Sequence, residues 1–215
     1  MKMSSANCRE RLEGESNRMH LQQQLFAEPI EVDASAGEWK GENGQLQLFQ
    51  TLWDDIESHV GSYTYGQLHI QRHSGEEVNV VFDGRYACAY FLTARLYHFH
   101  LLETWDGWVV NLPTLLAGGG WRQLPRVYWE NQYIPHLSVI IYQPFNGTPH
   151  TGFYMKDSQV ISTARHEDDP EDKRAVRRHH WLYEGREVFG DGPREVESIW
   201  LHPLLHGEKW SDFFP

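Results

Sequence analysis

Residues 83–113 read DGRYACAYFLTARLYHFHLLETWDGWVVNLP, and this long, weakly charged stretch decides the fold that the sequence predicts. Its opening Asp83-Gly84 dipeptide is typical of tight turns between antiparallel strands. The aromatic and β-favouring residues that follow indicate an extended chain. Because ordinary strands have about 5–6 residues, we expect a bend or break near Thr93-Ala94. A helix over the alanines and leucines of the same stretch is the alternative.

An extended chain in this stretch would place its histidines on an uncharged face. Side chains alternate between the two faces of a strand, so Tyr86, Tyr90, His98 and His100 would share one face. The opposite face would carry arginine and glutamate side chains, so we expect the histidine face to be the interior one. Histidine titrates near neutral pH and tyrosine can donate a proton. We therefore expect His98, His100 and Tyr90 to act as acid–base catalysts and Tyr86 to contact a ligand.

The composition bounds the class of protein. The chain has 215 residues, with 30 acidic and 19 basic residues and a formal net charge of −11. This charge disfavours binding to nucleic acid or to an anionic membrane, because phosphate contacts need clustered Lys and Arg. The two cysteines form no disulfide framework, and neither a signal segment nor a membrane-spanning run is recognised. We therefore expect a cytoplasmic protein without a membrane span.

The domain organisation follows from the distribution of turn signals. Residues 1–20 are polar, and we expect a disordered tail there, followed by a single domain over residues 21–215. Residues 19–30 and 45–60 have features of short helices; in the second, apolar residues recur at helical spacing. Elsewhere, turn signals, among them Asn146-Gly147 and Asp157-Ser158, separate about eight to ten short strands, which include residues 63–72 and 178–184. This pattern predicts a mainly β fold: one antiparallel β-barrel with one or two short helices.

A short motif near the first expected strand gives this barrel a family resemblance. Gly37-Glu38-Trp39 resembles the Gly-x-Trp entry signature of lipocalin-like barrels, the calycin superfamily, in which the tryptophan plugs the barrel base. The resemblance covers these three residues and the strand pattern. It implies a barrel that binds a hydrophobic or conjugated small molecule without a cofactor. Phycobilin lyases share this barrel type, so a lyase, isomerase or cyclase acting on a pigment-like molecule is one version of the expected function.

A second segment supplies candidate ligand contacts. Residues 126–133 alternate as a strand would, which places Arg126 and Glu130 on one face. We expect these two side chains to anchor polar groups of the ligand, and Trp129 to be a further ligand contact. A salt bridge between Arg126 and Glu130 is the alternative.

The histidine pair at 98 and 100 also supports a metal hypothesis. Two histidines two residues apart on a strand point to the same side, so both can bind one metal ion. The pair resembles the first metal motif of cupins, which implies a cupin-like double-stranded β-helix with a divalent transition metal on His98 and His100. His150 is the first candidate for a further ligand. The adjacent His179 and His180 would face opposite sides of a strand, so they could not bind one metal ion together there. The cupin glutamate follows its second histidine by four or five residues, whereas Glu103 follows His100 by three.

A third hypothesis is an acidic, non-enzymatic interaction protein whose aromatic residues, 9 Trp, 10 Tyr and 10 Phe, simply fill a core. A homodimer stays open under all three hypotheses. We expect Cys88 to be a small buried thiol, with a nucleophile as the alternative. His202 and His206 flank Pro203, and we expect them to cap a turn or the start of a helix.

Overall fold

The structure is a computed structural model that describes residues 43–71, 74–79, 81, 87–131, 133–164, 175–183, 194–207 and 210–214. The chain divides into two compact units: residues 1–38 with 69–80, and residues 39–68 with 81–215. Several predictions fall outside the described residues: the tail at 1–20, the helix at 19–30, Gly37-Glu38-Trp39 and Tyr86. They stay predictions.

The described part of the first unit is a β-hairpin. Strand β1 (His69–Gln71) pairs antiparallel with β2 (Glu77–Asn79), so that His69 lies opposite Asn79. Gly75 in the connecting turn has a φ of +83°, a conformation that glycine adopts without strain. An exposed ion pair joins His69 Nδ1 to Glu77 Oε1 at 2.6 Å. Exposed pairs of this kind contribute little to stability.

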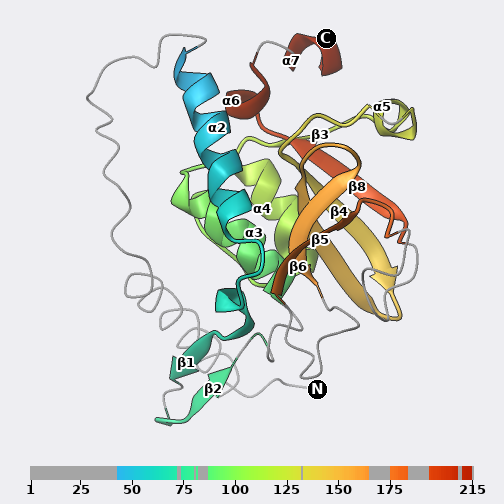
Figure 1. Ribbon diagram of the computed structural model, residues 1–215. Coiled ribbons are helices and arrows are strands. Elements are labelled where there is room, and N and C mark those ends of the chain that lie inside the picture. Colours follow the sequence, from blue (N-terminus) through green and yellow to red (C-terminus); the bar gives the residue numbers. More distant parts are fainter. Residues whose placement is uncertain are drawn as a thin grey trace, which may run out of the picture. The chain divides into compact units, whose positions relative to one another are not determined.

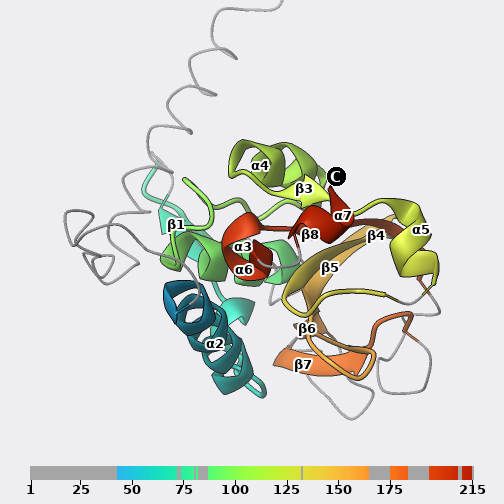
Figure 2. The ribbon, with the colours of Figure 1, turned by 90° about the horizontal axis from the view of Figure 1, so that it is seen from above.

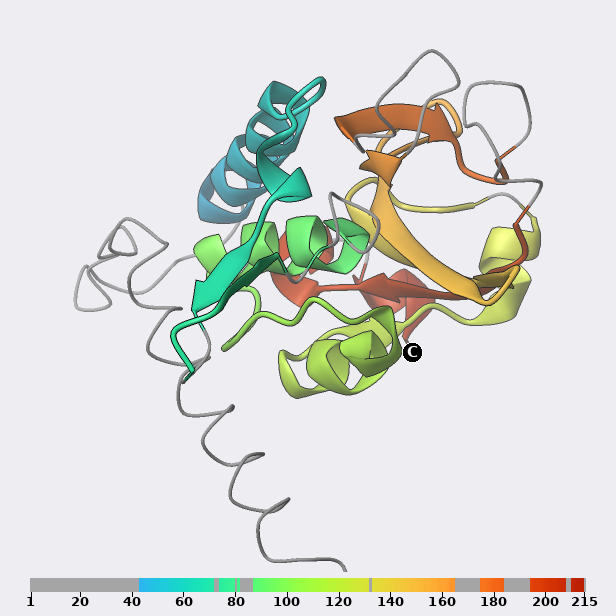
Figure 3. The same cartoon turned by 90° about the horizontal axis from the view of Figure 1, so that it is seen from below.

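The second unit is built on a six-stranded antiparallel sheet with the order β3-β8-β4-β5-β6-β7 (Figure 1). Its strands are β3 (Arg122–Gln123), β4 (Ser138–Phe145), β5 (Thr148–Tyr154), β6 (Gln159–Ala164), β7 (Ala175–His180) and β8 (Val196–Leu201). Every pairing is antiparallel. The predicted antiparallel sheet is therefore confirmed. Figure 3 shows how strongly the sheet curves along β4, β5 and β6.

Tight turns set the register of the central strands. Asn146 and Gly147, between β4 and β5, have φ values of 50° and 76°. Two consecutive positive φ angles match the hairpin turns that favour an Asn-Gly sequence. Asp157 and Ser158, between β5 and β6, also have positive φ values, of 52° and 61°. The sequence signals for both turns were correct.

Short helices surround the sheet. They are α2 (Asn43–Ser58), α3 (Ala87–His98), α4 (Leu112–Gly118), α5 (Arg126–Glu130), α6 (Pro203–His206) and α7 (Trp210–Phe213), with 3-10 turns at Thr64–Gly66 and Val109–Asn111. The predicted helix at 45–60 is confirmed by α2, whose Leu52 and Ile56 are fully buried. Helix α3 packs on β5 and β6, and Figure 2 shows it between α2 and the sheet.

Both faces of the sheet are buried. On one face, Phe153 of β5 meets Phe91 of α3 edge to face, with ring centroids 5.9 Å apart. The opposite face carries a second apolar cluster, in which the sheet side chains pack against residues from the loop after β7 and from α7. Its buried members are Leu124, Ile134, Ile140, Tyr142, Tyr154, Val160, Ala164, Trp181, Tyr183, Ile199, Leu201 and Phe213. We call this second face of the sheet the inner face.

The strand predicted after residue 83 is wrong, because residues 87–98 form helix α3. All of the first ten residues of α3 except Arg95 are buried, and Ala87, Ala89, Phe91 and Leu92 are fully buried. A helix that is buried on nearly all sides has no polar stripe, so it lacks the periodicity that identifies a surface helix. Its alanines and leucines favour helix by intrinsic propensity, and here that preference decides the outcome.

The strand predicted over residues 126–133 is also wrong, because residues 126–130 form the short helix α5. Pro125 precedes it and adopts an extended ψ of 138°, which suits a helix start. The 63–72 segment is a strand only over its end, at β1, and β7 begins three residues earlier than predicted. In the described residues, β3 and β7 are open edges of the sheet, so barrel closure stays a prediction.

Gly152 lies where β5 and β6 approach closely, and it provides a test of this packing. A Cβ atom there would lie 2.5 Å from Val160 Cγ1 and 2.9 Å from Ser162 Cβ. We expect Gly152→Ala to lower the free energy of unfolding by about 1–3 kcal/mol, because the added methyl overpacks a buried sheet. Urea unfolding measures this loss.

The matched control for that test is Gly118→Ala, where an added Cβ would meet no atom within 4 Å. Its stability should stay within about 0.5 kcal/mol of the parent protein. Equal stabilities for the two variants would contradict the close approach of β5 and β6.

Candidate functional site

The inner face of the sheet contains a row of buried polar side chains. His150 on β5, Ser162 on β6 and His179 on β7 have exposures of 2%, 0% and 0%. Burying a polar group costs free energy unless a hydrogen bond compensates it. Three such groups in one apolar cluster are therefore a candidate functional site rather than ordinary core.

The strand register explains why these residues meet. Tyr142 of β4 lies opposite His150 of β5, and Val160 of β6 lies opposite His179 of β7. Tyr154 pairs with Val160 across β5 and β6. Because side chains alternate along each strand, all of these positions point to the inner face. Residues far apart in the sequence are thus brought to one place by four adjacent strands.

A chain of hydrogen bonds links the three polar side chains. His150 Nε2 lies 2.9 Å from Ser162 Oγ, and Ser162 Oγ lies 2.7 Å from His179 Nε2. His179 Nδ1 lies 3.0 Å from the carbonyl oxygen of His180. We call these residues the His-Ser-His chain.

The backbone carbonyl sets the direction of the His-Ser-His chain. A carbonyl oxygen can only accept, so His179 Nδ1 carries the proton and donates to His180. In the neutral ring, His179 Nε2 is then an acceptor, and the Ser162 hydroxyl donates to it. His150 Nε2–H in turn donates to Ser162 Oγ. The arrangement aims a serine hydroxyl at a histidine base whose orientation a third group holds.

Aromatic rings enclose the His-Ser-His chain. The Tyr183 ring lies 4.2 Å from the ring of His179 and 5.4 Å from that of His150, between centroids. Tyr142 is 5.8 Å from His150 and 5.4 Å from Tyr183. The guanidinium of Arg194, which is only 3% exposed, sits 5.4 Å above the Tyr183 ring. The site therefore combines two imidazoles, a hydroxyl, two phenol rings and one buried positive charge.

The Tyr142 hydroxyl stands out within this cluster. Tyr142 is fully buried, and among the described residues its hydroxyl has no hydrogen-bond partner. Burial raises the pKa of Tyr142 above its ordinary value, against an opposing effect of the nearby Arg194 charge. The phenol is therefore a protonated donor at neutral pH.

The residues predicted as catalytic lie on helix α3 or just after it instead of on a strand. His98 is the last residue of α3, and His100 follows it in an exposed position with a φ of 55°. Tyr90 is buried within α3, 5.2 Å from the Trp105 ring. Partial burial, with the positive charge of Arg95 also contributing, lowers the pKa of His98. These side chains are not part of the His-Ser-His chain, and their predicted roles stay predictions.

The metal hypothesis depended on the strand that α3 replaces. Within the described residues, no group of three or more His, Cys, Asp or Glu side chains is arranged to hold a metal ion. His98 and His100 therefore gain no third ligand of these types there. His150, the further candidate, instead hydrogen-bonds Ser162.

The predicted ligand anchors on α5 form a surface ion pair. Arg126 Nε donates to Glu130 Oε1 at 2.7 Å, and the side chains are 75% and 53% exposed. The guanidinium of Arg126 also lies 5.2 Å from the Trp129 ring. Four residues separate Arg126 from Glu130, which is the spacing of neighbours on a helix. The structure thus matches the salt-bridge alternative.

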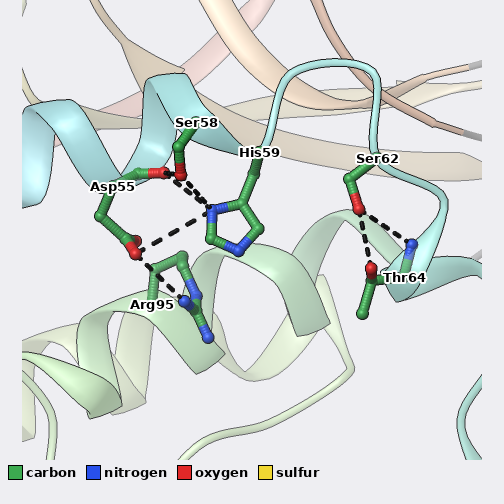
Figure 4. Close-up of polar contacts among 6 residues, drawn as sticks. All are labelled: Asp55, Ser58, His59, Ser62, Thr64 and Arg95. Atoms are coloured by element: carbon green, nitrogen blue, oxygen red, sulfur yellow. Dashed lines mark hydrogen bonds and ion pairs between the residues drawn. The ribbon is translucent and has the colours of Figure 1, made fainter.

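A second polar cluster joins α2 to α3 (Figure 4). Asp55 Oδ1 lies 3.4 Å from Arg95 Nη1, and His59 Nδ1 lies 2.7 Å from the Asp55 carbonyl oxygen. The Arg95 guanidinium also lies 5.7 Å from the Tyr65 ring. The Asp55–Arg95 contact joins the two helices, whereas the His59 contact is local to the end of α2 and the Tyr65 contact ties α3 to the 3-10 turn at Thr64–Gly66. We therefore place the candidate functional site at the His-Ser-His chain.

His202 has the capping role that the sequence predicted, whereas His206 is the last residue of α6. His202 Nδ1 accepts a hydrogen bond from Leu204 N at the start of α6, and His202 Nε2 donates to the Gly119 carbonyl oxygen. Both ring nitrogens of His206 face carbonyl oxygens, those of His202 and His136, at 2.9 Å. These histidines attach α6 to the rest of the unit.

Sequence reasoning missed most of the site. His150 was considered only as a metal ligand, and His179 was set aside because adjacent histidines point to opposite sides of a strand. That alternation is correct: His179 is fully buried, and His180 is not. The available signal was polar residues at alternate positions of otherwise apolar strands, such as Ser162 between Val160 and Ala164.

Burial lowers the pKa of His202 to about 4, from an ordinary value of 6.5. The unfolded chain therefore binds a proton at a higher pH than the folded protein does. We expect the free energy of unfolding to fall by about 2–3 kcal/mol as the pH drops from 6.5 to 4. Urea unfolding at a series of pH values measures this slope.

The control is His202→Asn, which keeps a side-chain acceptor for the start of α6 but does not titrate. The free energy of unfolding of this variant should depend less steeply on pH. Some dependence should remain because burial also lowers the pKa of His206. An unchanged slope would show that His202 is not the titrating group.

Cys88 lies in the first turn of α3 and is 6% exposed, as expected for a small buried thiol. We expect iodoacetamide to alkylate it at least about tenfold more slowly in the folded protein than in urea, because burial blocks access. A Cys8→Ser background isolates its signal. Faster alkylation in the folded protein would instead indicate a thiolate activated by the helix N-terminus, and would favour the nucleophile alternative.

Three kinds of comparison with known proteins gave the same result. No family model, no curated protein and no solved structure matches this chain. In the part of the chain that the structure describes, no helix is both long and apolar enough to cross a membrane. The functional argument therefore rests on the geometry of the inner face.

Proposed function

We propose that the inner face of the sheet binds a hydrophobic or conjugated small molecule and that the His-Ser-His chain performs acid–base chemistry on it. The observation that carries this proposal is the directed hydrogen bonding from His150 through Ser162 to His179. It supports proton transfer because each group can pass a proton to the next. The aromatic rings around it suit a flat, conjugated molecule, since rings stack with favourable energy.

The chemistry follows from the direction of the hydrogen bonds. When Ser162 gives its proton to His179, the resulting imidazolium is stabilised by the His180 carbonyl at Nδ1. Donation of the His150 Nε2 proton to Ser162 Oγ replaces the lost proton, while His150 Nδ1 takes a proton from the substrate, so that one proton moves in total from the substrate to His179. A substrate atom in contact with this chain would gain or lose a proton without bulk water. Isomerisation, cyclisation and elimination by a lyase all need such a step.

The curved sheet gives the proposed site its enclosure. We infer that the sheet acts as a partly closed barrel, with Trp181 and Tyr183 covering the inner face after β7 and Phe213 covering it from α7. In this arrangement the binding face is that of a lipocalin-like protein. The residues proposed to serve it lie on β4 to β7, whereas the earlier candidates lie on or next to α3 and on α5.

A second candidate function is acyl transfer with Ser162 as the nucleophile. The contacts of Ser162 favour this function. Its hydroxyl donates to His179, and the His180 carbonyl oxygen orients the His179 ring. Nucleophilic serines are activated in this way. A hydrolase of this type would form a covalent adduct at Ser162 with a phosphonofluoridate, whereas an acid–base enzyme would not.

The test is a fluorescence titration with biliverdin, a conjugated probe, that follows quenching of the tryptophans. We expect saturable quenching, and about tenfold weaker binding for His150→Ala, because one hydrogen-bonding group of the site is lost. The matched control is His98→Ala, which removes a histidine outside the site and should leave the affinity within about twofold. Circular dichroism confirms that each variant is folded.

Other outcomes of these measurements would support the competing hypotheses. If His98→Ala weakened binding and His150→Ala did not, the binding site would lie at α3 instead of on the inner face. About one equivalent of a transition metal in the purified protein, lost in His98→Ala, would favour the cupin-like alternative. No quenching by biliverdin or other flat apolar probes, together with no phosphonofluoridate adduct, would favour the interaction protein.

A further inference from the structure

The Tyr142 hydroxyl marks a position for one more polar atom on the inner face. Tyr142 is fully buried, and its hydroxyl has no hydrogen-bond partner among the described residues. An unmet buried hydroxyl costs free energy, so proteins seldom retain one without a compensating use. Phenylalanine would fill the same space without this cost. The hydroxyl therefore points to a group that binds there and accepts a hydrogen bond.

Arg194 supplies a positive charge that acts on this hydroxyl. Arg194 is 3% exposed and always protonated, and its guanidinium lies over the rings of Tyr183 and Phe145, 5.4 and 5.7 Å from their centroids. One of its nitrogens donates to the Thr148 carbonyl oxygen at 2.7 Å, which fixes the guanidinium. Arg194 acts electrostatically on Tyr142, since its charge favours the ionised phenol. A negative atom near the Tyr142 hydroxyl would gain from the same charge.

We propose that the molecule bound on the inner face is an aromatic or conjugated carboxylate, with its carboxylate accepting a hydrogen bond from Tyr142 in the field of Arg194. The rings of Tyr142 and Tyr183 would contact the apolar part of the ligand. This inference rests on the proposed function, because it names the class of molecule that the same site takes. It goes further in placing the negative end at Tyr142 and the reacting part toward Ser162.

A negative group suits this position better than a neutral one. A hydrogen bond from a neutral donor to a carboxylate is stronger than one to an uncharged acceptor. In a buried site the attraction to a nearby guanidinium is also larger than in water, because the local dielectric is low. A neutral ligand of the same shape would make the same ring contacts. It would lack the stronger hydrogen bond and the attraction to the guanidinium.

The test compares benzoate with benzamide, two flat probes of similar size that differ in charge. Binding is followed at pH 7 by intrinsic fluorescence and by the shift in Tm that ligand binding produces. We expect benzoate to bind about tenfold more tightly than benzamide, and Tyr142→Phe to remove this difference. The variant should fold with an unchanged or higher Tm, because it lacks only a buried hydroxyl that has no partner among the described residues.

The matched control is Tyr128→Phe. It also removes one phenol hydroxyl, but this hydroxyl donates to the Asp212 carbonyl oxygen at 2.8 Å. The Tyr128 ring packs against Phe213 of the apolar cluster, and Tyr128 is not part of the His-Ser-His chain. Tyr128→Phe should lower Tm through loss of that hydrogen bond and should keep the preference for benzoate. A preference that is lost equally in both variants would overturn the assignment to Tyr142.

The remaining outcomes separate this inference from the proposed function. If benzoate and benzamide bound equally well to the parent protein and to Tyr142→Phe, the proposal of a carboxylate ligand would be wrong. The site would still bind aromatic molecules. Absence of binding by both probes would also overturn the carboxylate. In that case the biliverdin titration decides whether the inner face binds conjugated molecules at all.

Discussion

Burial of both faces of the six-stranded sheet is the constraint on which this structure depends. Helix α3 covers one face, where Phe91 meets Phe153, and an apolar cluster covers the other. A sheet enclosed in this way must either be apolar on both sides or pair every polar group that it contains. The His-Ser-His chain follows from that requirement, because each of its nitrogen and oxygen atoms described above has a partner within 3.0 Å.

The same constraint makes the inner face suited to chemistry. A histidine at the surface exchanges protons with water, whereas His179 is fully enclosed and is held by a backbone carbonyl. Enclosure strengthens electrostatic interactions and limits the routes that a proton can take. Gly152 contributes to this arrangement from the backbone, because the absence of a side chain lets β5 approach Val160 and Ser162. Structure and proposed function therefore depend on the same close packing of β5 against β6.

Predictions from local chemistry were the most reliable. The Asn146-Gly147 turn, the amphipathic helix α2 and the capping role of His202 were each predicted from a few neighbouring residues. Predictions from alternation were less reliable in buried segments. Helix α3 and the strands both consist of buried residues, so their hydrophobic patterns are alike. Arg126 and Glu130 would share one face in a strand and also in a helix. Only the structure showed that this segment is a helix.

The sequence by itself determined that this chain forms an antiparallel sheet with tight turns, because turn residues and β-favouring runs act over short distances. It also identified an excess of histidine and aromatic residues, but not which of them meet. The tertiary structure decided that His150, Ser162 and His179 form one hydrogen-bonded chain beside Tyr142. The physical reason is register: pairing of four strands brings together residues from 142 to 179, and no local pattern encodes which positions lie opposite one another.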